Sequence, residues 1–282
     1  MTTIDRLGLA YNPTNDAAIE LRERAAGWCR MRGLDHWASA AGDYERLLAE
    51  LPTTDALIVL GGDGTFLRAA RAVADVDVPM LGVNLGKIGF LSKIEAHQLE
   101  TVLAQVAAGE FGIEERMAAR ATIHPGGHDQ GSEEYIALND VVVARGQLAR
   151  VVRLDVNVGP SHLATFIADG LVISTPTGST GYSFSAGGPI LDPVARNLIV
   201  TPIAGYLSAI RSVVVSPRHT VRCRVVDAVE ALISIDGRED RPVQVGDVIA
   251  VTAVQRPIRF IEPHGALPFW DLLRHKVQLL PV

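Results

Sequence analysis

The first segment that could do chemistry is Gly-Gly-Asp-Gly-Thr at residues 61–65, between the apolar run Ala56–Leu60 and a run with helical spacing. Glycines let a backbone approach phosphate oxygens, and a helix N-terminus offers free N–H groups and a positive dipole end. A carboxylate repels phosphates, so Asp63 needs a separate role. We expect it either to accept a proton from an attacking hydroxyl or to help hold Mg²⁺. The simpler alternative is that Asp63 caps the following helix.

A second segment is crowded with hydroxyl groups and glycines. Residues 169–189 read DGLVISTPTGSTGYSFSAGGP and begin with a predicted strand, Leu171–Ser174. Such a segment can donate hydrogen bonds to phosphates and sugar hydroxyls, and Tyr182 could stack on a base. A flexible surface loop is less consistent with Phe184 and Pro189 among the small residues. Ser179 lacks the Gly-x-Ser-x-Gly pattern of a nucleophile elbow, so we do not assign it a nucleophilic role.

A polar pair, Asn139-Asp140, interrupts the apolar run Ile136–Ala144. In a continuous strand, these two side chains would be turned toward a ligand such as a ribose. A β-bulge or a turn explains the pair equally well. His124 and His128 flank Pro-Gly-Gly, which favours a hairpin tip over a metal site.

The elements that must position these residues change character near residue 110. The first part alternates strands and helices, which predicts a parallel sheet with helices on its faces. The later part has short β-type runs separated by turn signals, which predicts two packed sheets. The expected strands of the first part are Leu7–Tyr11, Ala56–Leu60 and Met80–Asn84, and its helices are Asp16–Met31, Phe66–Ala74 and Leu99–Ala108. The later strands are Ala119–His124, Ile136–Ala144, Val151–Val158, His162–Ile167, Ser212–Ser216, Val221–Val226, Ala231–Ile235 and Val248–Val254.

The predicted fold class is therefore an α/β N-terminal domain with a parallel sheet, followed by an all-β, sandwich-like C-terminal domain. We place the first domain at residues 1–110 and the second at residues 111–262. Residues 263–282 form a C-terminal tail in which Phe269–Lys276 has helical spacing. We expect this tail to pack back on the N-terminal domain.

The composition narrows the class of protein. The chain has 282 residues, of which 48% are hydrophobic and 21% charged, and this is ordinary globular composition with length for two domains. A net charge of −6 without a basic stripe argues against a nucleic-acid binder. Neither a signal-peptide pattern nor an apolar run of roughly 20 residues is present. We therefore expect a cytoplasmic protein without nucleic-acid or membrane partners, with Cys29 and Cys223 as reduced thiols.

With these motifs in place, the chain resembles the NAD kinase family over most of its length. Gly-Gly-Asp-Gly-Thr alone is shared with lipid kinases and phosphofructokinases, but the long hydroxyl-rich segment is diagnostic. The matching motifs are Gly61–Thr65 with Leu67, Ala69, Ala70 and Arg71, then Asn84–Leu91, then Asn139-Asp140, and finally Asp169–Pro189.

The resemblance implies phosphorylation of the adenosine ribose 2′-hydroxyl of NAD by ATP with Mg²⁺, or by polyphosphate in some members. It also implies a homodimer or homotetramer. NAD would lie in a cleft between the domains, with its ribose toward Asp63 as proton acceptor. The other residues implied at the NAD site are Gly64, Arg68, Asn139 and Asp140 (which hold a ribose), Arg150, Asp169, Thr180, Gly181, Tyr182, Ser183, Phe184 and Ser185.

Three positions depart from the usual family pattern. Gly181 stands where alanine is usual, which leaves more room and a freer backbone. Ile167 stands two residues before Asp169, where many members carry arginine, and Arg238 stands where glutamine is common. Ile167 therefore removes a possible charged contact near Asp169.

Two other functions are consistent with parts of the sequence. A lipid or sugar kinase could share the Gly-Gly-Asp-Gly-Thr loop, but it would need an apolar or a smaller acceptor pocket. The hydroxyl-rich segment Thr175–Ser185 argues against an apolar pocket. A non-catalytic NAD(P)-binding sensor would need no base, so the intact Asp63 argues against it. In a kinase, the acceleration would come mainly from positioning and electrostatics.

Overall fold

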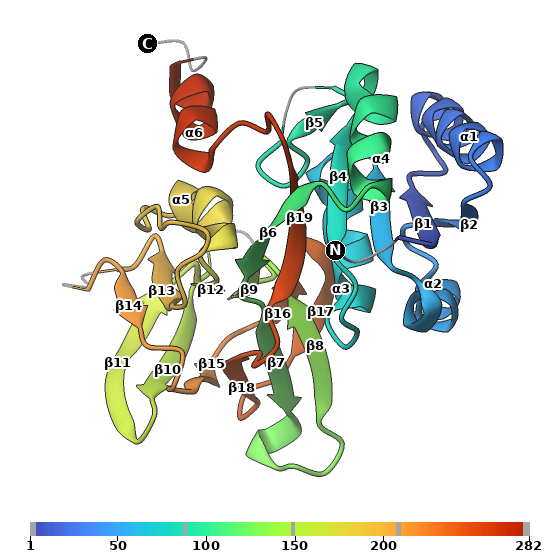
Figure 1. The fold of residues 1–282 in the computed structure, drawn as a ribbon. Helices are drawn as coiled ribbons and strands as arrows, with labels where there is room; N and C mark the ends of the chain where they lie inside the picture. Colours follow the sequence, from blue (N-terminus) through green and yellow to red (C-terminus); the bar gives the residue numbers. More distant parts are fainter. Residues whose placement is uncertain (1–3, 87–88, 148–149, 207–209, 279–282) are drawn as a thin grey trace. The chain divides into compact units, whose positions relative to one another are not determined.

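The polypeptide forms two units, and one of them is built from both ends of the chain (Figure 1). Unit 1 contains Met1–Glu115 and Ile258–Val282, and unit 2 contains Arg116–Pro257. The boundaries expected from the sequence, residues 110 and 262, each lie five residues from these divisions. The computed structural model describes residues 4–86, 89–147, 150–206 and 210–278.

Unit 1 is organised around a seven-stranded sheet. Its strand order is β2-β1-β3-β4-β19-β6, with β5 paired to β4. The pairs β1–β2, β1–β3, β3–β4, β4–β5 and β4–β19 are parallel. Strands covered on both faces read as continuous apolar runs, as in β3. The strands are β1 (Arg6–Tyr11), β2 (Asp35–Ala40), β3 (Ala56–Leu60), β4 (Met80–Asn84), β5 (Ile94–Glu95), β6 (Phe111–Arg116) and β19 (Ile258–Pro263).

Helices of unit 1 bury their apolar faces against this sheet. In α1, the Asn15 side chain caps the helix by accepting a hydrogen bond from the Ala18 N–H. Leu21 of α1 and Leu103 of α4 belong to the same buried cluster as Ile58 of β3. The helices are α1 (Asp16–Met31), α2 (Tyr44–Glu50), α3 (Asp63–Val73), α4 (Leu99–Ala107) and α6 (Phe269–Gln278), with 3₁₀ turns η1 (Leu51–Thr53) and η2 (Ala96–Gln98).

The C-terminal helix α6 packs on unit 1. The ring centroids of Phe269 and Phe90 lie 5.9 Å apart, and Lys276 Nζ lies 4.9 Å from the Phe90 centroid. No helix within the described residues is long and apolar enough to span a bilayer.

Unit 2 consists of two six-stranded antiparallel sheets, with orders β11-β10-β15-β18-β7-β8 and β14-β13-β12-β9-β16-β17. The first sheet contains β7 (Ala119–His124), β8 (Glu133–Ala137), β10 (Val152–Val158), β11 (Ser161–Ala168), β15 (Val221–Asp227) and β18 (Val248–Ala253). The second contains β9 (Asp140–Arg145), β12 (Gly170–Ser174), β13 (Leu198–Ile203), β14 (Val213–Val215), β16 (Ala231–Ile235) and β17 (Arg238–Val243). Between strands lie η3 (Pro125–Gly127), η4 (Thr177–Thr180) and the short helix α5 (Tyr182–Ser185).

A single hydrophobic cluster fills the space between the two sheets of unit 2. Alternate residues of β10, such as Leu154 and Val156, meet alternate residues of β9, such as Val141 and Val143. Two antiparallel sheets with a shared core form a sandwich. The predicted fold class, an α/β domain with a mostly parallel sheet followed by an all-β domain, is confirmed.

The structure differs from the prediction at the run Ile136–Ala144, which is not one strand. β8 ends at Ala137 in the first sheet of unit 2, and β9 begins at Asp140 in the second. Leu138 and Asn139 are therefore the point at which the chain crosses between sheets. The polar pair marks this crossover, which no apolar pattern reveals.

Candidate active site

In unit 1, Asp63 lies at the first residue of α3, directly after β3 and two glycines. Gly62 occupies the N-cap position and has no side chain that could cap the helix. The Asp63 carboxylate instead accepts hydrogen bonds from the Phe90 N–H at 2.8 Å and from the Leu91 and Ser92 N–H groups at 3.1 Å. The alternative in which Asp63 merely caps its own helix is therefore wrong.

The bonds to Asp63 are divided unequally between its two oxygens. Oδ1 accepts from two N–H groups and Oδ2 from one. An ionised carboxylate offers about four acceptor positions, so one position on Oδ2 is left for a ligand. The close approach requires glycine at residue 89, because a Cβ there would overlap the carboxylate. Lys87 and Ile88 of the predicted motif lie outside the described residues.

The two other predicted site residues of unit 1 follow Asp63 in α3. Gly64 is exposed, and a Cβ at this position would meet no atom within 4 Å. The Arg68 side chain is half-buried, and its Nη2 donates to Thr65 Oγ1 at 3.4 Å. The first turn of α3 thus has open space beside Gly64.

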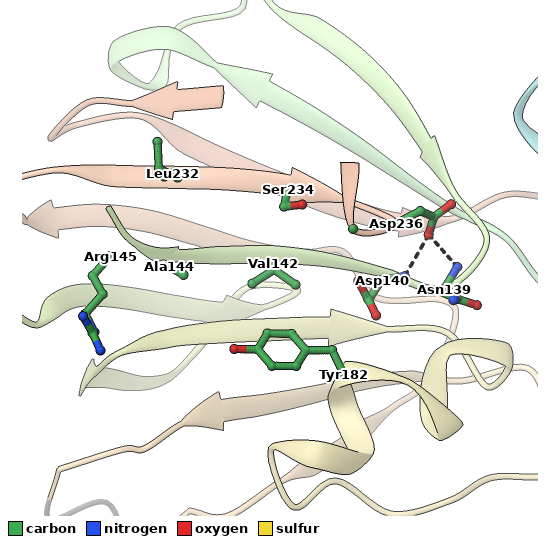
Figure 2. Close-up of a pocket in the computed structure, with 10 residues that line it drawn as sticks. Asn139, Asp140, Val142, Ala144, Arg145, Tyr182, Leu232, Ser234 and Asp236 are labelled. Carbon is green, nitrogen blue, oxygen red and sulfur yellow. Dashed lines mark hydrogen bonds between the residues drawn. The ribbon is translucent and has the colours of Figure 1, made fainter. Parts of the chain in front are cut away.

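Unit 2 contains a cavity of about 490 Å³ along β9 and β16 (Figure 2). Side chains of a strand alternate between its two faces, so those pointing away from the sandwich core can line this cavity. On β9 the core residues are Val141 and Val143, and on β16 they are Ala231 and Ile233. The cavity is lined by Asn139, Asp140, Val142, Ala144, Arg145, Tyr182, Leu232, Ser234, Asp236 and Gly237.

One end of this cavity carries the predicted polar pair. Asp140 is 5% exposed, and Asn139 is half-buried. Within the described part of the chain, neither the Asn139 amide nor the Asp140 carboxylate has a hydrogen-bond partner. Burial, together with the nearby negative charge of Asp236, raises the pKa of Asp140 to about 7. These two side chains are available to a ligand that has hydroxyl groups.

The other end of the cavity carries an ion pair. Arg145 Nε lies 2.8 Å from Asp169 Oδ1, and Nη2 donates to Asp169 Oδ2 at 3.2 Å. Arg145 lines the cavity, whereas Asp169 is the residue between β11 and β12 and is not among the lining residues. The sequence has Ile167 at a position near Asp169 where many members of the family carry arginine. The structure shows that Arg145 of the neighbouring strand supplies a charge at Asp169 instead.

The predicted run Thr180–Ser185 forms the last residue of η4, the residue Gly181 and helix α5. Within this run, the cavity is lined by Tyr182, whose side chain is 47% exposed. Figure 2 shows the Tyr182 ring alongside β9, with its hydroxyl toward the Arg145 end. Ser183 is buried, and its hydroxyl has no partner among the described residues, whereas Phe184 and Ser185 are exposed. A Cβ at Gly181 would lie 3.9 Å from Asp140 Oδ2, so an added methyl would reach the edge of the site.

Arg150 is exposed and does not line the cavity. Sequence reasoning missed Arg145, Asp236, Ser234 and Leu232. The signal for Leu232 and Ser234 was present, because alternate residues of β16 point away from the core. Arg145 carried no such signal, since its role depends on the pairing of β9 with β12.

Comparison with known proteins agrees with this arrangement. The chain matches the ATP-NAD kinase N-terminal domain over residues 29–111 and the ATP-NAD kinase C-terminal domain over residues 138–263. It is 37% identical over 257 residues to NAD kinase of Dehalococcoides mccartyi, covering 91% of this chain and 90% of that relative.

Two solved structures share the fold. Yeast NADH kinase complexed with NADH has a TM-score of 0.82 at 23% identity, covering 99% of this chain and 88% of that one. An NAD kinase from Archaeoglobus fulgidus in complex with ATP has a TM-score of 0.78 at 22% identity, covering 98% and 100%. With both family domains matched along most of its length, the chain belongs to the ATP-NAD kinase family.

Proposed function

We propose that this protein is an NAD kinase that transfers the terminal phosphoryl group of ATP to the 2′-hydroxyl of the adenosine ribose of NAD. The observation that carries the proposal is the polar end of the unit 2 cavity. There the Asn139 amide and the Asp140 carboxylate, which have no hydrogen-bond partner among the described residues, face the cavity beside Tyr182. A ribose offers hydroxyl donors and acceptors that match an amide and a carboxylate.

In this proposal, Asp63 accepts the proton of the 2′-hydroxyl as that oxygen attacks the phosphorus. Its Oδ2 is the oxygen with acceptor capacity left, because Oδ1 already accepts two backbone N–H bonds. The same bonds hold the carboxylate in one orientation, so it does not have to be ordered during the reaction. The start of α3 places its free N–H groups next to this carboxylate, where a phosphate can bind.

The remaining predicted residues of each unit are proposed to contact the dinucleotide. Gly64 and Arg68 supply the surface next to Asp63, and Thr180 to Ser185 form one wall of the NAD pocket. Asp169 acts at the far end through its ion pair with Arg145. Arg150, which lies apart from the cavity, is proposed to contact only an extended part of the substrate.

ATP is the proposed phosphoryl donor, with polyphosphate as an alternative donor in the same role. The related protein solved with ATP supports this choice. Within the described residues, no three His, Cys, Asp or Glu side chains lie together as a metal site. Mg²⁺ is therefore proposed to arrive as part of the MgATP substrate, since Mg²⁺ is commonly held by phosphates and one or two carboxylates.

Family membership also supports a cytoplasmic homodimer or homotetramer that uses NAD and ATP as small-molecule partners. Light scattering of the purified protein tests the oligomeric part of the proposal. A monomer at micromolar concentration would contradict it.

The central experiment incubates the purified full chain with ATP, Mg²⁺ and NAD, and detects NADP with an NADP-specific dehydrogenase. We expect NADP to form only when all three are present. NADH replaces NAD in a parallel reaction, with the product detected after oxidation. The absence of product from both dinucleotides would contradict the proposed function.

A further inference from the structure

The chain between β8 and β9 is held with every backbone polar group satisfied. The N–H groups of Leu138, Asn139 and Asp140 donate to the Asp236 carboxylate at 2.9, 2.7 and 3.1 Å. Their carbonyls accept from Thr175 Oγ1 at 2.5 Å, from the Thr175 N–H at 2.9 Å and from the Asp236 N–H at 2.9 Å. Asp236 and Thr175 together therefore make all six bonds of this three-residue segment, which we call the acceptor corner.

Asp236 has a backbone conformation that non-glycine residues rarely adopt. It lies in the turn between β16 and β17 with φ of 54°, a left-handed value that is uncommon outside glycine. Its side chain is directed back at the acceptor corner, as the dashed lines of Figure 2 show. Such conformations cost energy and persist where the surrounding contacts require them.

Two carboxylates, those of Asp140 and Asp236, line the same end of the cavity. Asp236 uses its oxygens on the three N–H donors, which favour its ionised form and oppose the effect of burial on its pKa. Asp140 has no hydrogen-bond donor of its own within the described residues. Repulsion from Asp236 therefore favours an Asp140 side chain turned away from it and into the cavity.

Among the described residues, few charged groups act on this pair of carboxylates. Arg238 acts on Asp236, and Asp236 is the charge that acts on Asp140. From α5, the facing side chain is the phenol of Tyr182, and from β12 it is the neutral Ser174, which pairs with Asp140. The Arg145–Asp169 ion pair lies at the other end of β9. Asp236 is thus the dominant charged neighbour of Asp140.

We propose that Asp236 is a positioning residue of the acceptor site: its carboxylate fixes the acceptor corner, and its negative charge keeps Asp140 turned toward the ribose. The inference rests on the proposed function, in which Asn139 and Asp140 hold that ribose. Three backbone N–H groups take most of the acceptor positions of Asp236, so it acts through its neighbours.

The test replaces Asp236 with asparagine, which keeps the shape but removes the charge and part of the acceptor capacity. We expect kcat/KM for NAD to fall by about 10–100-fold, as is typical for residues that orient ligand-binding groups. KM for ATP should change by less than about twofold, because binding of ATP does not use the acceptor corner.

The pH profile separates this role from a merely structural one. In the wild type, Asp140 should give kcat/KM for NAD an acidic limb near pH 7, because the ionised carboxylate accepts from the ribose. Removal of the negative neighbour in Asp236→Asn should move this limb to lower pH, while the effect of burial on the pKa of Asp140 stays. A limb that stays in place would overturn the proposal.

Asp247→Asn is the matched control. Asp247 is also a buried aspartate of unit 2 that accepts backbone N–H bonds, from Gly126 at 2.7 Å and Gln244 at 2.8 Å, but it does not line the cavity. It should leave both kcat/KM for NAD and the pH limb unchanged. An equal loss in Asp247→Asn and Asp236→Asn would also overturn the proposal.

Thr175→Val supplies a second test if Asp236→Asn does not fold. It removes the hydroxyl bond to Leu138 without changing any charge, so NAD affinity should fall several-fold with the limb in place. Unchanged affinity would contradict the role of the acceptor corner. NAD binding is measured by calorimetry in parallel, so a wild type that binds NAD without turnover would contradict the proposed function and still leave this inference testable.

Discussion

The two carboxylate oxygens of Asp63 differ in the hydrogen-bond acceptor capacity that remains on each. Three backbone N–H groups from Phe90 to Ser92 fix the carboxylate, and the remaining acceptor position is on Oδ2. A carboxylate held by backbone groups keeps its place when the substrate binds, so in the proposed mechanism the base needs no further ordering.

Asp63→Asn should therefore lower kcat by about 10²–10⁴-fold while leaving the NAD dissociation constant within about twofold, because it removes the proposed base but not the acceptor cavity. The coupled assay gives kcat and calorimetry gives the affinity. Asp16→Asn is the control, since Asp16 is likewise the first residue of a helix, α1, and its side chain is exposed. Substantial turnover in Asp63→Asn would rule out Asp63 as the base.

The pKa of Asp140 predicts how stability depends on pH. Its native value of about 7 lies above the ordinary 3.8, so the folded chain binds more protons than the unfolded chain between about pH 4 and pH 7. The stability contribution of Asp140 therefore falls as pH rises through that window. Asparagine has no proton to lose, so Asp140→Asn should gain stability relative to wild type as pH rises.

We expect this relative gain to grow by roughly 2–3 kcal/mol between pH 5 and pH 8, at about 1.4 kcal/mol per pKa unit. Urea unfolding of both proteins without NAD at the two pH values measures it. A constant difference between Asp140→Asn and wild type would show that Asp140 ionises at an ordinary pH.

At the scale of elements, the residues of β9 form the site only because this strand is paired between β12 and β16. The sequence was sufficient for the elements with clear periodicity, such as α1, β3 and β4, and for the positions of the motifs. It was not sufficient for β2, with polar residues along an edge strand, or for β19, whose charged Arg259 and Glu262 sit in a central strand. Tertiary pairing decides such strands, and sequence patterns do not record it.

The same limit applies to the site. Asn139, Asp140 and Tyr182 were identified from the motifs, and the cavity contains them. Asp236 was visible in the sequence only as part of an Asp-Gly turn. Its bonds to the acceptor corner join residues separated by almost one hundred positions, so only the fold reveals them.

Close packing between η4 and the acceptor corner predicts the effect of a single methyl group. A Cβ at Gly178 would overlap the backbone of Asn139, which cannot move aside as a side chain can. Gly178→Ala should cost about 1–3 kcal/mol of unfolding free energy and raise KM for NAD.

Gly27→Ala is the matched control for this change. Gly27 lies inside α1, and its Cβ would meet only the end of the flexible Arg30 side chain, at 3.9 Å. It should gain about 0.5–1 kcal/mol from the higher helix propensity of alanine. Chemical denaturation compares the two variants, and changes of the same sign would contradict the packing argument.

At the scale of the whole molecule, unit 1 is discontinuous and unit 2 is a single stretch of chain. β19 occupies an interior position in the sheet of unit 1, between β4 and β6. Each unit has its own hydrophobic cluster, one from the strands and helices of unit 1 and one between the sheets of unit 2.

Truncation after Pro257 should therefore unfold unit 1 while unit 2 stays folded. Removing β19 leaves β4 and β6 without their shared neighbour, and the sheet loses its continuity. Truncation after Pro268 removes only α6 and its contact with Phe90, so unit 1 should persist with lower stability. Limited proteolysis distinguishes the two, and a protease-resistant unit 1 without β19 would contradict the prediction.

The interior place of β19 also has a consequence for synthesis. While a ribosome makes residues 116–257, the strands β1 to β6 have already emerged, but the strand that joins β4 to β6 does not yet exist. At about 5–20 residues per second, this interval lasts roughly 7–28 s. During that time the part of β4 around Met80 that will pair with β19 is an unpaired apolar edge, which can join the edge of another nascent chain. Chaperones should therefore be needed mainly by residues 1–115, although this part of the chain is made first.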